Sequence, residues 1–206
     1  KDIFILNIMN QNIININKIK SFIMFNLFEY VYSFKFNKLL SRNFVCLTHA
    51  LGSVGLNTIE NKELYQVSNI WSTGYFMYDI IFTLRYEKLN PMRLFFLYHH
   101  IASTYIIHKD PKYYYGDKIL FWSELSNIPS YFIYYYLHTK IINKNKVKFW
   151  LNIQKYLYST IRIPVLGYYL ANCLKLASNK TPILSVIPIY LMGILWTFKI
   201  YKQKIE

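Results

Sequence analysis

Six long apolar runs, separated by short polar connections, dominate this chain. The runs lie at about residues 42–59, 68–86, 92–109, 117–138, 148–172 and 181–199. A helix needs about 20 mostly apolar residues to cross the hydrocarbon core of a bilayer. The connections, such as "YEKLNP" and "TKIINKNK", are too short to form a domain of their own. The pattern predicts an all-α fold, a polytopic membrane bundle of six core transmembrane helices.

The composition favours the same class of protein. Hydrophobic residues make up 54% of the chain and charged residues 17%, whereas a water-soluble domain usually carries about 25% charged residues. The net charge of +14 is spread over the connections and does not form the aromatic-interleaved basic surface of a nucleic-acid-binding protein. We therefore expect membrane lipids, and no nucleic acid, as partners. Cys46 and Cys173 have no CxxC partner, so no metal site is expected. The oligomeric state stays open.

Residues 1–40 form a less clear segment before the six runs. "KDIFILNIMNQNIININKIK" is rich in Asn and Lys, and "SFIMFNLFEYVYSF" (21–34) is apolar but short and contains Glu29. An N-terminal interfacial helix and an additional membrane helix are both compatible with this segment. The expected organisation is the N-terminal segment 1–40, a membrane domain over 41–200 and a basic tail over 201–206.

The distribution of Lys and Arg predicts the orientation in the membrane. With residues 1–42 in the cytosol and six spans, the cytosolic segments hold sixteen Lys and Arg residues and the opposite side holds six. Positive charge favours the cytosolic side, so both termini are expected there. Lys202 and Lys204 resemble a dilysine retrieval signal, which predicts the endoplasmic reticulum or a related intracellular (or host) membrane. A basic tail that only anchors the topology is the alternative.

Ionisable side chains interrupt five of the six runs: His49, Asp79, His99, His100, Glu124 and Arg162. A charge at the bilayer centre costs about 2.5–3.5 kcal/mol even on the lenient insertion scale. We therefore expect these side chains to point inward, toward one central polar cavity, with Arg162 neutralising Asp79 or Glu124. The alternative is a structural network of ion pairs and hydrogen bonds that fixes the helix packing.

The adjacent residues His99 and His100 are candidates for proton transfer, because histidine titrates near neutral pH. Neighbouring residues of a helix lie about 100° apart. Both histidines can therefore border a cavity without pointing the same way. We expect one of them to donate to a carboxylate and the other to face a substrate.

Five segments, taken in order, resemble the TLC domain, the membrane domain shared with the ceramide synthases. They are "SRNFVCLTHALGS", "STGYFMYDI", "LFFLYHHIAS", "FWSELSNIPSYF" and "STIRIP". The resemblance covers roughly residues 40–200 and is closest to the small TLC-domain-containing transmembrane proteins. The residues that match the pattern of that branch are His49, Gly74, Tyr75, Asp79, His99, His100, Glu124, Leu125, Ser126, Arg162 and Ile163.

The resemblance implies at least six helices around a central, lipid-accessible cavity. In ceramide synthases, paired histidines and two downstream aspartates serve acyl transfer from acyl-CoA to a sphingoid amine. The histidine pair is present here, but Glu124 and Asn127 stand roughly where the aspartates would be. This departure argues against ceramide synthesis in particular.

One functional hypothesis is an enzyme related to acyltransferases that acts on membrane lipids, and the sequence does not separate it from a protein that only binds them. Its expected catalytic residues are His99, His100, Asp79 and Glu124, and its expected substrate-binding residues are Arg162, His49, Ser126 and Asn127. Arg162 would hold an anionic head group or a pantetheine phosphate. Acyl-CoA would be a co-substrate, and no bound cofactor is expected.

Two other classes of protein remain as alternatives. One is a non-catalytic, lipid-binding regulator of membrane composition or trafficking. The other is a small transporter, which ionisable residues at mid-membrane depth would suit. The sequence shows no internal repeat and no paired Gly/Pro-broken spans in two related halves, and these are features of many transporters.

Overall fold

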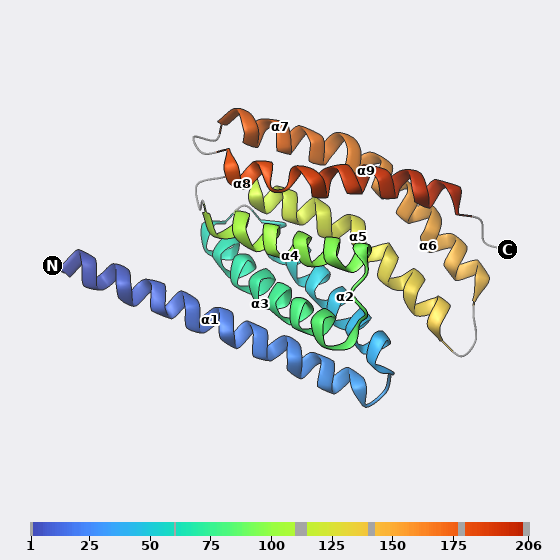
Figure 1. Cartoon of the computed structure of the whole chain (residues 1–206), viewed down its shortest axis with the longest axis horizontal. Coiled ribbons are helices and arrows are strands. Elements are labelled where there is room, and N and C mark those ends of the chain that lie inside the picture. Colours follow the sequence, from blue (N-terminus) through green and yellow to red (C-terminus); the bar gives the residue numbers. More distant parts are fainter. Residues whose placement is uncertain (1, 60, 110–114, 140–142, 177–179, 204–206) are drawn as a thin grey trace.

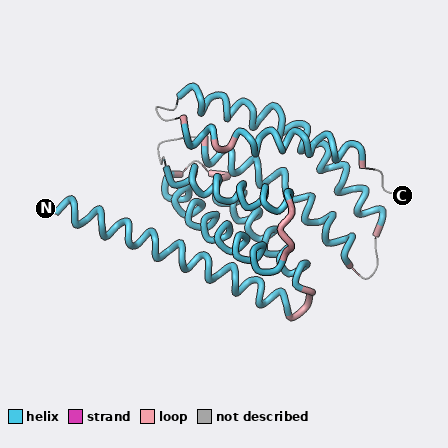
Figure 2. The backbone as a smooth tube through the Cα atoms, viewed as in Figure 1, coloured by secondary structure: helices cyan, strands magenta, loops and turns pink. Residues whose placement is uncertain are grey.

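A computed structural model describes residues 2–59, 61–109, 115–139, 143–176 and 180–203, and these form helices and short turns without a strand among them (Figure 2). The fold class is therefore all-α, as predicted. The helices are α1 (Asp2–Ser33), α2 (Lys38–Leu56), α3 (Lys62–Tyr86), α4 (Pro91–Lys109), α5 (Gly116–His138), α6 (Lys144–Leu157), the π-helix η1 (Tyr158–Val165), α7 (Leu166–Leu176), α8 (Thr181–Leu184) and α9 (Ile187–Lys202).

Each of the six apolar runs forms helix. The first four correspond to α2, α3, α4 and α5. The fifth run is one long helical path of α6, η1 and α7, whose central turns are π-helical around Pro164. The sixth is divided into α8 and α9 at residues 185–186. The N-terminal segment is also helical, and the expected boundary at residue 40 falls inside α2.

Asparagine side chains mark the beginnings of four helices. Asn37 accepts a hydrogen bond from the backbone of Leu40, and Asn61 and Asn143 cap α3 and α6 in the same way. Asn90 accepts from the backbone N–H of Arg93, directly before a proline that opens α4. Asn is among the best residues at this position, and Pro is favoured at the first helical position. The helix starts are thus determined by local sequence.

The helix α1 lies lengthwise against α3 and also packs on α2 (Figure 1). Ser21 and Phe25 of α1 are buried. A Cβ atom added to Gly74 of α3 would lie 2.7 Å from the backbone nitrogen of Phe22. Small residues allow this close approach of two helix backbones, as they do in membrane helix pairs.

Replacing Gly74 by Ala is therefore expected to lower the stability by about 1–3 kcal/mol, the usual cost of overpacking a tight contact. The matched control is Gly55→Ala in α2, where an added Cβ would meet no atom within 4 Å. That control should be neutral or stabilising by up to about 1 kcal/mol, since Ala is the better helix former. Thermal unfolding of the purified variants tests this, and equal melting temperatures would contradict the close packing of α1 on α3.

The interior of the bundle mixes polar side chains with apolar core clusters, and many large apolar side chains lie on its outer surface. Its buried polar side chains include Ser41, Asn43, His49, Ser53, Ser68, Ser72, Asp79, Thr83, His100, Glu124, Ser126, Gln154, Arg162 and Thr197. Large apolar side chains are exposed on every long helix described, among them Ile23, Leu51, Leu84, Ile101, Leu137, Phe149, Tyr168 and Leu195. A water-soluble bundle buries its apolar faces instead.

Within the part of the chain that the structure describes, one helical segment, Thr181–Lys202, is long and apolar enough to cross a membrane by length and composition. Helices buried in soluble proteins can meet the same criterion, so a single segment does not establish a membrane bundle. The other expected spans carry many Tyr, Asn and Ser residues, which lower their hydropathy.

Candidate functional site

A cavity of about 460 Å³ lies inside the bundle, between α2, α3, α4, α5, α9 and the stretch from α6 into η1. Most of the residues expected to form the site line it, namely Asp79, His99, His100, Glu124, Asn127 and Arg162. Three charged residues that were not expected there also line it: Arg42, Glu87 and Arg93. We call this space the polar cavity. The inward orientation predicted for Asp79, His100, Glu124 and Arg162 is confirmed by their burial.

A second, smaller cavity of about 110 Å³ adjoins the polar cavity. Its wall is mainly apolar and includes Ile106, Ile119, Leu166, Leu170, Ile183 and Val186. Five residues line both spaces, so the two cavities adjoin there: His99, Glu124, Arg162, Ile189 and Gly193. We call the smaller space the apolar cavity.

Asp79 of α3 is held by Arg42 of α2 and His100 of α4. The Nε and Nη2 atoms of Arg42 donate to the two carboxylate oxygens at 2.7 and 2.8 Å, and Nε2 of His100 lies 2.8 Å from Oδ2. Arg42 also donates to Glu87 at 2.8 Å, and Glu87 lies 2.6 Å from Arg93. The result is a chain of alternating charges that joins α2, α3 and α4 along one wall of the polar cavity.

Arg162 was expected to neutralise Asp79 or Glu124. The first alternative is wrong, because the guanidinium beside Asp79 belongs to Arg42. For the second, Arg162 acts on Glu124 by charge, without a direct ion pair. In the sequence, Arg42 stands at the edge of the first apolar run and reads as a cytosolic flanking charge. One signal could have found it. Arg42 lies about four helical turns before the connection between α2 and α3, and Asp79 about five turns after it, so an antiparallel hairpin brings them together.

Arg162 is directed instead toward α5. Its Nε atom donates to Ser126 Oγ at 2.8 Å, and Nη2 donates to the Ser123 carbonyl at 3.1 Å and to Asn127 Oδ1 at 2.6 Å. The π-helical turns place this residue inward, as π-bulges do at many functional sites. Gly193 of α9 lies beside this side chain, and a Cβ there would make an ordinary van der Waals contact, 3.4 Å from Arg162 Cδ.

The two adjacent histidines have different surroundings, as expected. His100 is buried and bonded to Asp79. His99 is half-buried and lines both cavities, and its buried Nδ1 atom has no hydrogen-bond partner. Both histidines border the polar cavity, but His100 is engaged with Asp79, whereas His99 is the more exposed of the two and also borders the apolar cavity.

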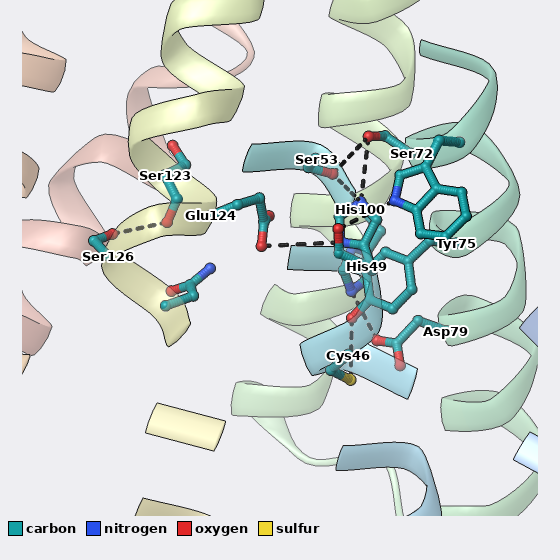
Figure 3. A network of polar contacts seen from close by, with 12 residues as sticks. Cys46, His49, Ser53, Ser72, Tyr75, Asp79, His100, Ser123, Glu124 and Ser126 are labelled. Carbon is teal, nitrogen blue, oxygen red and sulfur yellow. Dashed lines mark hydrogen bonds and ion pairs between the residues drawn. The ribbon is translucent and has the colours of Figure 1, made fainter. Parts of the chain in front are cut away.

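His49 lies behind the cavity wall, in a network of buried polar groups (Figure 3). Its Nε2 atom lies 3.2 Å from Ser72 Oγ and 3.1 Å from Ser53 Oγ, and its Nδ1 atom faces Glu124 Oε2 at 3.9 Å. The ring stacks on Tyr75 with 3.9 Å between centroids.

This group has the composition of a serine–histidine–acid triad, but its geometry suits packing. Ser53, Ser72 and His49 are completely buried, and the walls of the two described cavities do not include them. The structure thus does not support the substrate-binding role expected for His49. Ser126 is also completely buried and bonds to Arg162, so it positions that arginine and would not touch a ligand.

Over the described residues, no group of three or more His, Cys, Asp or Glu side chains is arranged to hold a metal ion. Comparisons with known proteins identify no relative: no family model matches the chain, and no curated protein or solved structure gives a significant match. The function must therefore be argued from the residues and the geometry of the two cavities.

Proposed function

We propose that this chain is a multi-pass membrane protein that binds a membrane lipid in the polar cavity and acts on it, with acyl transfer at His99 as the reaction. One observation carries the proposal: a cavity with several ionisable side chains lies between helices that expose many apolar side chains on their outer faces. The resemblance to the TLC domain supports the same class of protein.

The apolar outer face supports the membrane part of the proposal. Exposed Leu, Ile, Phe and Tyr side chains occur on the outward faces of α1, α3, α5, α7 and α9. Patches this extensive on a soluble monomer would promote association. Charges such as Asp79 and Glu124, in contrast, are inside, where ionisable residues of membrane spans usually lie.

The cavity offers the groups that acyl transfer needs. A hydroxyl or amine of the lipid acceptor would attack the thioester carbonyl of acyl-CoA, and His99 would take the proton that this group loses. The bond from the carbonyl carbon to sulfur then breaks, and the proton passes to the departing CoA thiolate. His100, Asp79 and Arg42 would position the helix that carries His99.

A non-catalytic lipid-binding regulator is the second candidate, and one observation favours it. The Nδ1 atom of His99 has no hydrogen-bond partner, whereas a catalytic histidine is usually oriented by a third group. A cavity that only binds a lipid needs no such group.

Lipid analysis of membranes that express the wild type or the double variant His99→Ala/His100→Ala tests the proposal. A lipid product that appears with the wild type and disappears with the double variant supports acyl transfer. A lipid that copurifies with the wild type, without any new product, supports the regulator. Release of the protein from membranes by alkaline carbonate would contradict the membrane assignment, because integral proteins stay in the pellet.

The packing of α1 bears on the orientation of the N-terminus. The helix α1 has 32 residues, which at about 1.5 Å per residue is long enough to cross a bilayer, and it lies lengthwise against α3. This favours an additional membrane helix over an interfacial one. The N-terminus would then lie opposite the C-terminus, in place of the expected arrangement with both termini in the cytosol.

Protease protection in sealed microsomes tests this orientation. A tag before residue 1 should be protected, and a tag after residue 206 should be digested, since the basic tail is expected in the cytosol. Digestion of both tags would instead mean that α1 lies in the membrane interface and does not cross the membrane.

Residues 204–206, including Lys204 of the dilysine pattern, lie outside the described part of the chain. The retrieval signal stays a proposal, and relocation of the Lys202→Ser/Lys204→Ser variant would support it.

A further inference from the structure

Arg162 differs from the other two arginines of the polar cavity in the groups that its guanidinium contacts. Arg42 is paired with Asp79 and Glu87, and Arg93 is paired with Glu87. The hydrogen bonds found for Arg162 among the described residues go to a carbonyl, a hydroxyl and an amide, all of them neutral. A buried charge is normally paired with an opposite one. Arg162 interacts by charge with the nearby carboxylate of Glu124 but forms no direct ion pair with it, so its guanidinium remains available to an anion that enters the cavity.

The acidic side chain that shares this part of the wall is Glu124. Its Oε2 atom faces Nδ1 of His49 at 3.9 Å and has no hydrogen-bond partner (Figure 3). The carboxylate of Glu124 also has a side-chain hydrogen bond with Asn127, and Asn127 Oδ1 accepts from Arg162, so this amide lies between the two charged groups. Glu124 would repel an anion near Arg162. Removing its charge should therefore strengthen anion binding, whereas removing the charge of Arg162 should weaken it.

Arg162 also stands where the polar and apolar cavities meet. Beyond it, the apolar cavity continues between η1, α7 and the α8–α9 segment, past Leu166 and Leu170 to Ile183. A guanidinium matches the geometry of a carboxylate or a phosphate. The position joins an anion-binding group to a narrow apolar space, and this combination suits a molecule with one charged end and one hydrocarbon chain.

We propose that Arg162 binds the anionic head of a single-chain lipid, whose hydrocarbon chain begins in the apolar cavity. A volume of about 110 Å³ holds only the first few carbons, and the rest of the chain continues through the open side of this cavity. The inference rests on the proposed function in placing the protein among lipids, and it specifies the class of ligand. His99 lies at the same junction, beside the first atoms of the bound head group. Both a carboxylate and a phosphate monoester have the required charge, so the binding experiment must include both.

Binding of radiolabelled oleate to the purified full chain in detergent tests the inference. Unlabelled oleate or oleoyl-lysophosphatidate should compete, and oleyl alcohol should compete at least about tenfold more weakly, because it lacks the charge. Competition by lysophosphatidate with no binding of oleate would assign the head group as a phosphate. Equal competition by oleyl alcohol would overturn the anion site.

Substitutions locate the site. Arg162→Gln should weaken oleate binding about 10- to 100-fold, the effect of losing a charge-assisted hydrogen bond, and the exposed control Lys175→Gln should not change it. Glu124→Gln should strengthen binding, because a negative charge is removed. Unchanged binding in both cavity variants would refute the proposal. If Arg162→Gln does not fold, Arg162→Lys and Glu124→Gln still decide the outcome.

The chain-binding part has its own test. Val186→Phe adds volume to the wall of the apolar cavity and should shift the preference from oleate to shorter fatty acids. Leu191→Phe, at an exposed position of α9, is the matched control. An unchanged chain-length preference would place the hydrocarbon chain elsewhere. Oleate binding that depends on Arg162, without any lipid product in membranes, would refute acyl transfer and leave this inference standing.

Discussion

Replacing Arg42 by Met is expected to destabilise the protein by about 3–5 kcal/mol, because it leaves a buried carboxylate without its counter-charge. Asp79 is 2% exposed and receives two hydrogen bonds from Arg42. Glu87 would lose one of its two arginine partners as well. The yield of monodisperse protein and its melting temperature are the measurements. Arg85→Met, an exposed arginine in the last turn of α3, is the control.

A second substitution separates the loss of the ion pair from the loss of arginine packing. Adding Asp79→Asn to Arg42→Met removes the uncompensated charge and should recover part of the lost stability. A double-mutant cycle over the two sites then measures their coupling. If Arg42→Met melted at the same temperature as Arg85→Met, the buried pair that joins α2 to α3 would not exist.

Replacing His99 by Ala and replacing His100 by Ala are expected to have different effects on activity and on stability. His99→Ala should abolish the lipid product, by a factor of about 100 or more if His99 is the general base, and should change the stability little. His100→Ala should cost about 1–3 kcal/mol, because Asp79 loses one of its hydrogen-bond donors. Product per folded protein and the melting temperature distinguish these outcomes, with the exposed His138→Ala as the control.

The opposite result would assign the role of general base to His100. Full product formation by His99→Ala, with none by a folded His100→Ala variant, would make the histidine bonded to Asp79 the reactive one. The pair would then resemble an acid–base dyad, in which the carboxylate orients the imidazole. Product from both variants would make the histidines structural, as the alternative interpretation of the sequence holds.

The positions of the helices could be predicted from the sequence because their causes are local. Apolar runs of sufficient length form helices, and Asn37, Asn61 and Asn143 begin them by bonding the backbone of the first turn. The inward orientation of Asp79, Glu124 and Arg162 was also predictable, since a charge on an otherwise apolar helix avoids an apolar exterior. Each of these inferences uses the sequence of one helix and the free-energy cost of placing its side chains in polar or apolar surroundings.

The choice of partners was decided by the tertiary structure. Ion pairs form over 3 to 4 Å, and a shift of one helical turn, about 5.4 Å, exchanges one partner for another. The lengthwise register of α2 against α3 brings Arg42 to Asp79, and the π-helical turns direct Arg162 to Ser126 and Asn127. The same registers place His49 behind the wall and His99 at the junction of the two cavities. Helix register depends on contacts between segments far apart in the chain, such as Gly74 against Ser21, which the pattern of a single helix does not contain.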